Sequence, residues 1–179
     1  MLSFAGAIEQ AFRRGLAPCA PTLRAGRLSF ALRVQTLSPE DIRKTANEAV
    51  ARYGDEALPP SRVARLWEER ALALGEQPDH ENIRIPYLRL GDLTIVSLPF
   101  EGYVKTGELA RSALRDDKVI ALGCAEQLLG YLPTREDIVN VSYGAMESAF
   151  LYQRMPPMPG EAERLGAFVG DALRNEEIT

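Results

Sequence analysis

Glu101 lies where a predicted strand gives way to a predicted helix. The stretch GDLTIVS at 91–97 is apolar enough to form a buried strand, and the following LPFEGYVKTGELAR at 98–111 takes on helical spacing. Proteins of the α/β class commonly place their chemistry at strand ends of this kind. The alternative is structural, because an acidic residue in the first turn of a helix interacts favourably with the helix dipole. Spacing alone favours the structural interpretation.

Tyr131 is the second candidate, because it follows the next apolar strand. That strand, KVIALGCA at 118–125, leads into EQLLGYLPTRED, where a glycine precedes the tyrosine and a proline follows it two residues later. Glycine gives backbone freedom and proline removes it, so the tyrosine would be held in place. If the two strands are parallel, the right-handed crossover rule puts Glu101 and the 126–134 loop at one sheet edge, where they form a crevice. The alternative is a packing tyrosine whose hydroxyl meets the backbone.

Other reactive side chains give weaker signals. His80, the single histidine, lies in the polar segment PDHEN, where histidines are far more often solvated than catalytic. Ser38 in TLSPED is explained by a helix cap. Cys19 and Cys124 form no CxxC pair and are most simply buried thiols in a reducing compartment. The sequence contains no GxSxG, P-loop, HExxH or GxGxxG motif.

The bulk composition limits the class of protein. The chain has 179 residues, 46% hydrophobic and 26% charged, as expected for one globular domain. The net charge of −4 is well mixed and forms no basic stripe, so nucleic acid is not an expected partner. No apolar run reaches the length of a membrane span, and Glu9 interrupts the apolar part of a poor signal peptide. We therefore expect a cytoplasmic protein.

Periodicity predicts a single α/β domain over residues 1–179, with a mixed or mostly parallel sheet flanked by helices. Strands are expected at 27–37, in two segments of 82–100 joined at Gly91-Asp92, and at 118–125, where the apolar run is typical of a central strand. Helices are expected at 1–15, 38–54, 61–75, 101–115 and 160–175, with a short helix or irregular segment at 143–155.

Four segments taken together resemble one known family. They are LRLGDLTIVSLPFEGYVKTGELAR, KVIALGCAEQLLGYLPTRED, SYGAMESA and PGEAERLGAFVGDAL. Their order and spacing are similar to the latter part of the catalytic domain of neutral/alkaline non-lysosomal ceramidases and their bacterial relatives, over residues 86–175. The resemblance implies about half of that α/β domain. It also implies hydrolysis of an amide bond by water that a zinc ion activates.

The resemblance implies two zinc ligands in this chain, Glu101 and Tyr131. In the family the ligands are two histidines, a glutamate and a tyrosine, and the histidines belong to a first half that this chain does not match. His80 lies in a different segment, Phe100 replaces a family glycine, and the family's serine motif has no counterpart. Two oxygen ligands without imidazole hold zinc poorly. No catalytic residue is assigned.

Three hypotheses follow. The chain is an incomplete or split zinc-dependent amidohydrolase, completed by a homo-oligomer or by a separate N-terminal chain that carries the histidines. Alternatively, it is a non-catalytic α/β domain that binds a ligand or partner in the crevice between Glu101 and the 126–134 loop. The third hypothesis is a plain α/β domain in which Glu101 only starts a helix. Under the first two, the exposed edges of half a sheet favour self-association or a partner chain.

Overall fold

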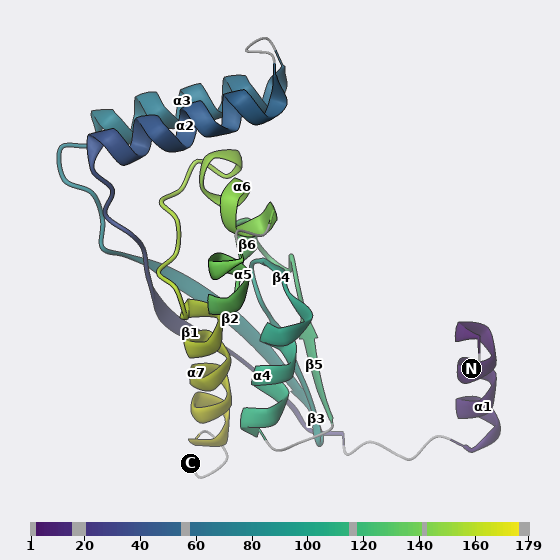
Figure 1. Cartoon of the computed structure of the whole chain (residues 1–179). Helices are drawn as coiled ribbons and strands as arrows, with labels where there is room; N and C mark the ends of the chain where they lie inside the picture. The colour runs from purple at the N-terminus through teal and green to yellow at the C-terminus, as the bar shows by residue number, and fades with distance from the viewer. Residues whose placement is uncertain (1–2, 16–20, 55–57, 115–117, 141–142, 176–179) are drawn as a thin grey trace.

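The computed structural model describes residues 3–15, 21–54, 58–114, 118–140 and 143–175. Its main sheet has four strands in the spatial order β1-β2-β3-β5 (Figure 1). The first two pairs are antiparallel and the β3–β5 pair is parallel, so the sheet is mixed, which confirms the predicted fold class. The strands are β1 (Leu23–Arg33), β2 (His80–Leu90), β3 (Leu93–Ser97) and β5 (Val119–Leu122).

Helices form two groups around this sheet. One group, α4 and α7, packs along one face of the sheet, and α2 and α3 form a hairpin beyond one end of it (Figure 1). Between the hairpin and the sheet lies α6, and α1 stands apart with no buried residue. Among the described residues, no helix has both the length and the apolar character needed to cross a membrane. The helices are α1 (Phe4–Arg13), α2 (Pro39–Tyr53), α3 (Pro59–Ala73), α4 (Val104–Leu114), α5 (Arg135–Val139), α6 (Tyr143–Leu151) and α7 (Glu161–Asn175).

Capping residues set the ends of α2 as the sequence predicts. The Ser38 hydroxyl accepts a hydrogen bond from the Asp41 backbone N–H at 3.1 Å, and Pro39 takes the first helical turn, where no donor is required. Gly54 ends the helix with φ +72°, a conformation that glycine adopts without strain. Ser3 caps α1 in the same manner. The predicted cap at Ser38 is confirmed.

The core lies between the sheet and the helices on its covered face. Alternate residues of β1, namely Leu28, Phe30 and Leu32, are buried, as the period of two predicts. Ile85 lies opposite Leu28 on β2 and is fully buried. The Phe30 ring meets Phe168 of α7 with centroids 5.2 Å apart. Aromatic contacts of this kind fix α7 against β1.

The prediction for one apolar segment is wrong. The 118–125 run was expected to be a central strand, but β5 lies at the edge of the sheet, and Ile120 and Leu122 are 41% and 43% exposed. In α3 the buried stripe consists of Trp67 with small residues, whereas Leu66 is exposed. The alanine and serine residues on that stripe allow close helix approach.

Two single residues also differ from expectation. His80 does not lie in a loop but begins β2, where it is exposed with its Nδ1 2.5 Å from Asp79 Oδ1. Cys124 is exposed rather than buried. The other cysteine, Cys19, lies outside the described residues. Cys124 follows an edge strand, which explains why it is more exposed than a residue after a central strand would be.

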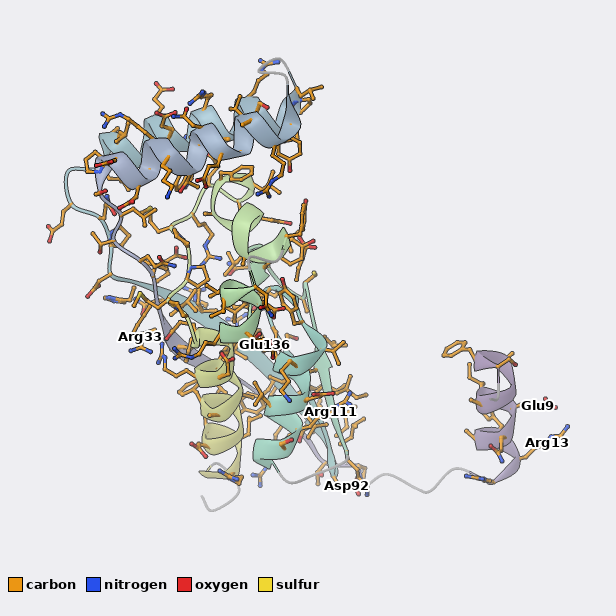
Figure 2. All side chains as sticks on the ribbon, viewed as in Figure 1. Glu9, Arg13, Arg33, Asp92, Arg111 and Glu136 are labelled. Atoms are coloured by element: carbon orange, nitrogen blue, oxygen red, sulfur yellow. The ribbon has the colours of Figure 1, made fainter. Side chains whose placement is uncertain are left out.

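A buried carboxylate ties α7 to the edge strand β1. Glu161 is fully buried and accepts hydrogen bonds from the Arg33 backbone N–H and Nε, both at 2.8 Å, and from Arg164 Nε at 2.9 Å. Figure 2 shows Arg33 beside the start of α7. Burial raises the pKa of Glu161, but the hydrogen bonds from Arg164 and Arg33 outweigh burial and hold that pKa below its ordinary value of 4.5. The charged form is therefore the one that the fold stabilises.

Glu161→Gln is expected to lower the free energy of unfolding by roughly 2–3 kcal/mol at neutral pH, because charge-assisted hydrogen bonds are lost. A carboxyl whose pKa is lowered by folding stabilises the protein above the unfolded pKa and ceases to do so as pH falls through the folded pKa. Wild-type stability should therefore fall as the pH drops below the ordinary pKa of 4.5, and less steeply in the variant. Urea unfolding at several pH values measures both effects. The exposed Glu136 supplies the control, Glu136→Gln, and equal acid sensitivity in wild type and Glu161→Gln would contradict the assignment.

Candidate functional site

Glu101 and Tyr131 lie directly opposite each other on two short parallel strands. These strands are β4 (Glu101–Gly102) and β6 (Tyr131–Leu132), and the Glu101 backbone N–H donates to the Gly130 carbonyl at 2.9 Å. The sequence places the two residues at the same sheet edge, and the structure brings them together. Glu101 does not occupy the first turn of a helix, because α4 begins only at Val104. The helix-start interpretation is therefore wrong.

The crevice continues the parallel pairing of β3 with β5. Beyond those strands, the Leu98 N–H donates to Leu122 O at 2.7 Å, and the Cys124 N–H donates to Phe100 O at 2.8 Å. The Leu129 N–H then donates to Pro99 O at 2.8 Å. Backbone hydrogen bonds therefore run continuously from the sheet to the site, and they fix both loops without any side chain.

Packing at Phe100 and Gly130 holds the two loops in place. Phe100 is buried, with the Arg154 guanidinium 5.7 Å from its ring centroid, so the bulk next to Glu101 points into the core. Gly130 has φ +88°, and a Cβ there would lie 2.6 Å from Cδ2 of Tyr152. Both the backbone conformation and the packing of Tyr152 therefore require glycine at this position.

Two phenols lie at the Glu101 carboxylate. The Tyr152 hydroxyl donates a hydrogen bond to Glu101 Oε1, and the Tyr131 phenol is near enough for the carboxylate to raise its pKa. Hydrogen bonding to Glu101, then burial and the carboxylate charge, raise the pKa of Tyr131 to about 12 and that of Tyr152 to about 12. The site thus holds one carboxylate and two protonated phenols in contact.

Glu101 and Tyr131 border an open pocket of about 560 Å³. Tyr131 makes edge-to-face contacts with Tyr103 and Tyr143, at centroid distances of 6.3 and 5.8 Å. A Cβ on Gly144 would lie 2.9 Å from Cγ of Tyr131, so glycine keeps the pocket open. The lining residues are Glu101, Gly102, Tyr103, Gly123, Cys124, Tyr131, Tyr143 and Gly144.

Sequence reasoning missed several members of this site, among them Tyr103, Gly144 and Tyr152. Tyr103 follows Glu101 by two residues, a spacing at which side chains of extended chain share a face, so a usable signal existed. Gly144 stands in the SYGAMESA segment, but its role depends on where α6 crosses the tyrosines. Tyr152 carries no local signal at all, because only the path of the chain after α6 brings it to Glu101.

The described residues do not by themselves form a zinc site. No group of three His, Cys, Asp or Glu side chains among them comes together as metal ligands would. Glu101 and Tyr131 offer two oxygen atoms, and the carboxylate already accepts a hydrogen bond from a phenol. Catalytic zinc sites use three protein ligands, usually with imidazole among them. The donor set of this chain therefore does not fit zinc unless further ligands are supplied.

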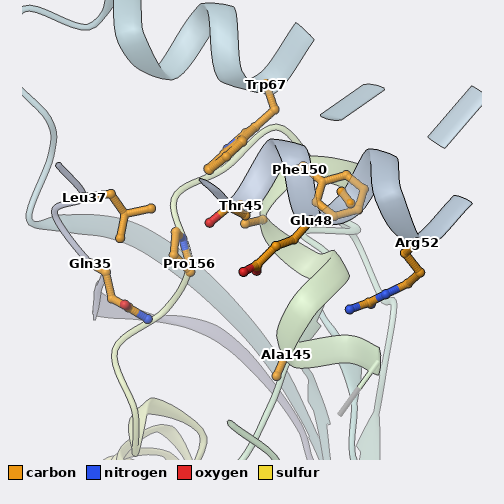
Figure 3. Close-up of a pocket in the computed structure, with 11 residues that line it drawn as sticks. Gln35, Leu37, Thr45, Glu48, Arg52, Trp67, Ala145, Phe150 and Pro156 are labelled. Atoms are coloured by element: carbon orange, nitrogen blue, oxygen red, sulfur yellow. The ribbon is translucent and has the colours of Figure 1, made fainter. Parts of the chain in front are cut away.

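A second cavity lies elsewhere in the fold. It measures about 250 Å³ and opens between the helical hairpin, α6 and the segment after β1 (Figure 3). Trp67 and Phe150 form apolar parts of its wall, while Thr45, Glu48 and Arg52 of α2 add polar groups. None of the residues with predicted roles lies there.

Comparisons with known proteins support the fold. No protein-family model matches the chain, and no curated protein matches it significantly. A crystal structure of the neutral ceramidase from Pseudomonas aeruginosa is similar to this chain at 17% identity and a TM-score of 0.48. The match covers 97% of this chain and 31% of the ceramidase chain. A ceramidase complexed with C2 is similar to this chain at 16% identity and a TM-score of 0.50. That match covers 97% of this chain and 33% of the ceramidase chain. The fold is similar to part of a ceramidase. This chain spans about a third of the length of both solved proteins.

The phenol–carboxylate contacts predict an unusual titration. Of the six tyrosines, Tyr131 and Tyr152 should ionise only near pH 12 in wild type. Glu101→Gln removes the negative charge, so both pKa values should move toward the ordinary 10.0. Ultraviolet difference titration measures the ionisation, and Tyr131→Phe and Tyr152→Phe identify the two groups. Unchanged titration in Glu101→Gln would show that the carboxylate does not contact the phenols.

Proposed function

We propose that this chain is the portion of a ceramidase-like, zinc-dependent amidohydrolase that carries Glu101 and Tyr131, with the remaining metal ligands coming from another polypeptide. The observation that carries the proposal is the register of β4 and β6, which sets the two side chains next to each other at one pocket. The similarity of the fold to part of a ceramidase supports it. On this proposal the chain alone does not hydrolyse amides.

The residues of this chain would serve such a site by holding oxygen donors in place. Glu101 is fixed by its backbone hydrogen bond to Gly130 and by the Tyr152 hydroxyl, so it is oriented before any ligand arrives. Tyr131 is positioned by its strand and by the rings of Tyr103 and Tyr143. Preorganised donors of this kind lose little entropy when they bind. Tyr152, whose hydroxyl donates a hydrogen bond to the carboxylate, acts as a positioning residue.

Zinc binding in the presence of imidazole tests the proposal, because imidazole supplies the missing nitrogen ligands. Wild type should bind about one zinc ion per chain far more tightly with imidazole than without it. Glu101→Ala should weaken that binding about tenfold or more, the scale on which metal sites respond to lost partners. Competition with a chromophoric chelator measures the affinity.

The matched control for this experiment is Glu108→Ala, which removes an exposed carboxylate from α4. It should leave zinc affinity unchanged. If imidazole brings no gain in zinc affinity, or if the Glu101 and Glu108 variants behave alike, Glu101 is not a metal ligand.

A second function is favoured by one specific observation, namely that the Glu101 carboxylate already accepts a hydrogen bond from the Tyr152 hydroxyl and lies near the Tyr131 phenol. In that case the pocket binds a neutral ligand without metal. Its walls are chiefly tyrosine rings, which offer apolar surface, and the hydroxyls beside Glu101 offer hydrogen bonds. A small amide with an alkyl tail has the matching combination of groups.

Calorimetry with an N-acetylalkylamine and chelator-treated protein tests this second function. Binding should be observed in wild type and lost in Gly144→Ala, because the new Cβ would lie 2.9 Å from the Tyr131 ring. Gly75→Ala is the control, since a Cβ at Gly75 would meet nothing within 4 Å. Absence of binding in wild type, or equal binding in both variants, would exclude a metal-free ligand site in this pocket.

A further inference from the structure

The cavity beside the helical hairpin has an apolar interior whose walls are held in place. Trp67 of α3 and Phe150 of α6 are each 2% exposed, and both line the cavity. The Trp67 indole Nε1 donates a hydrogen bond to the Arg154 carbonyl at 2.9 Å, which fixes the ring. Ala49 of α2 and Ala149 of α6 also line the space and are buried. Longer side chains at these two positions would fill the cavity, so small side chains keep it open.

The groups at the cavity mouth are polar and come mainly from one face of α2. Thr45, Glu48 and Arg52 follow one another at intervals of three and four residues, so they share that face. Figure 3 shows the Glu48 carboxylate turned toward the cavity. In the segment after β1, Gln35 donates its Nε2 to the Pro157 carbonyl at 2.9 Å, which fixes its side chain. The mouth therefore offers charge and hydrogen bonds, whereas the interior offers apolar surface.

Glu48 and Arg52 bring opposite charges to the mouth without pairing with each other. They stand four residues apart on α2, a spacing at which a glutamate and an arginine commonly form an ion pair. Within the described part of the chain, no ion pair or hydrogen bond engages the Glu48 carboxylate. The Arg52 guanidinium has five N–H donors, so it can bind a carboxylate in addition to its contacts within the chain.

These two charges restrict the class of ligand. A simple amine would be attracted to Glu48 but repelled by Arg52, and a simple acid would meet the opposite situation. A ligand that carries both charges avoids either conflict. The volume also limits size, because about 250 Å³ holds roughly eight non-hydrogen atoms at the ~30 Å³ that one water molecule occupies in the liquid. A zwitterion about as large as valine or leucine fits both limits.

We propose that this cavity binds a free α-amino acid with an apolar side chain. The ligand side chain packs between Trp67 and Phe150, its ammonium group binds Glu48, and its carboxylate binds Arg52. The Thr45 hydroxyl adds a hydrogen bond at the mouth. Apolar walls with a few convergent polar groups are typical of small-molecule sites. Because the two rings are already packed, binding orders few groups of the protein.

Calorimetry on the full chain with L-leucine and two matched analogues tests the proposal. Wild type should bind leucine at least tenfold more tightly than isopentylamine, which lacks the carboxylate, or isocaproate, which lacks the amine. Glu48→Gln and Arg52→Gln should each weaken leucine binding about tenfold or more, because each removes one charge-assisted contact. Ala145→Leu adds bulk to the half-buried cavity wall without changing a charge, and it should abolish binding.

The matched control is Glu69→Gln, because Glu69 is exposed on α3 and does not line the cavity. It should bind leucine as wild type does, and circular dichroism checks that each variant is folded. The proposal is overturned if wild type binds neither leucine nor valine, or if it binds either analogue as tightly as leucine. Equal leucine affinity in folded Glu48→Gln and Glu69→Gln would overturn it as well. Glu101→Ala should bind leucine normally, so the outcome is independent of the metal experiment.

Discussion

The parallel pairing of β3 with β5 is the constraint on which the rest of the structure depends. Because both strands run in the same direction, the two loops that follow them leave from the same end of the sheet and stay hydrogen-bonded to each other. That pairing resumes in β4 and β6, where Glu101 meets Tyr131. If either strand were reversed, the carboxylate and the phenol would emerge at opposite ends of the sheet. No adjustment of side chains would then bring them together.

Strong local signals made several elements predictable from the sequence. The cap at Ser38, the stop at Gly54 and the alternation in β1 depend on neighbours only a few residues away. The shared sheet edge of Glu101 and Tyr131 was also predictable, because it depends only on strand direction and crossover handedness. These features are confirmed because local chemistry and chain connectivity suffice to determine them.

The remaining features depend on contacts that no short window contains. An apolar run such as 119–122 looks the same in a central strand and in an edge strand, so its position in the sheet was predicted wrongly. Tyr152 lies next to Glu101 only because α6 crosses above the pocket and the chain then turns back. Likewise, the short strands β4 and β6 have no periodicity of their own and exist because their flanking loops are already aligned.

The hydrogen bond from Trp67 links the helical hairpin to this pocket. Its indole Nε1 donates to the Arg154 carbonyl at 2.9 Å, and Arg154 Nε bonds to Glu81 of β2 at 2.9 Å. Tyr152 stands only two residues before Arg154, so the hydrogen bonds of Arg154 to α3 and to β2 also hold the segment that carries the Tyr152 phenol. The α2–α3 hairpin therefore helps to fix the position of Tyr152, although neither of its helices lines the Glu101 pocket.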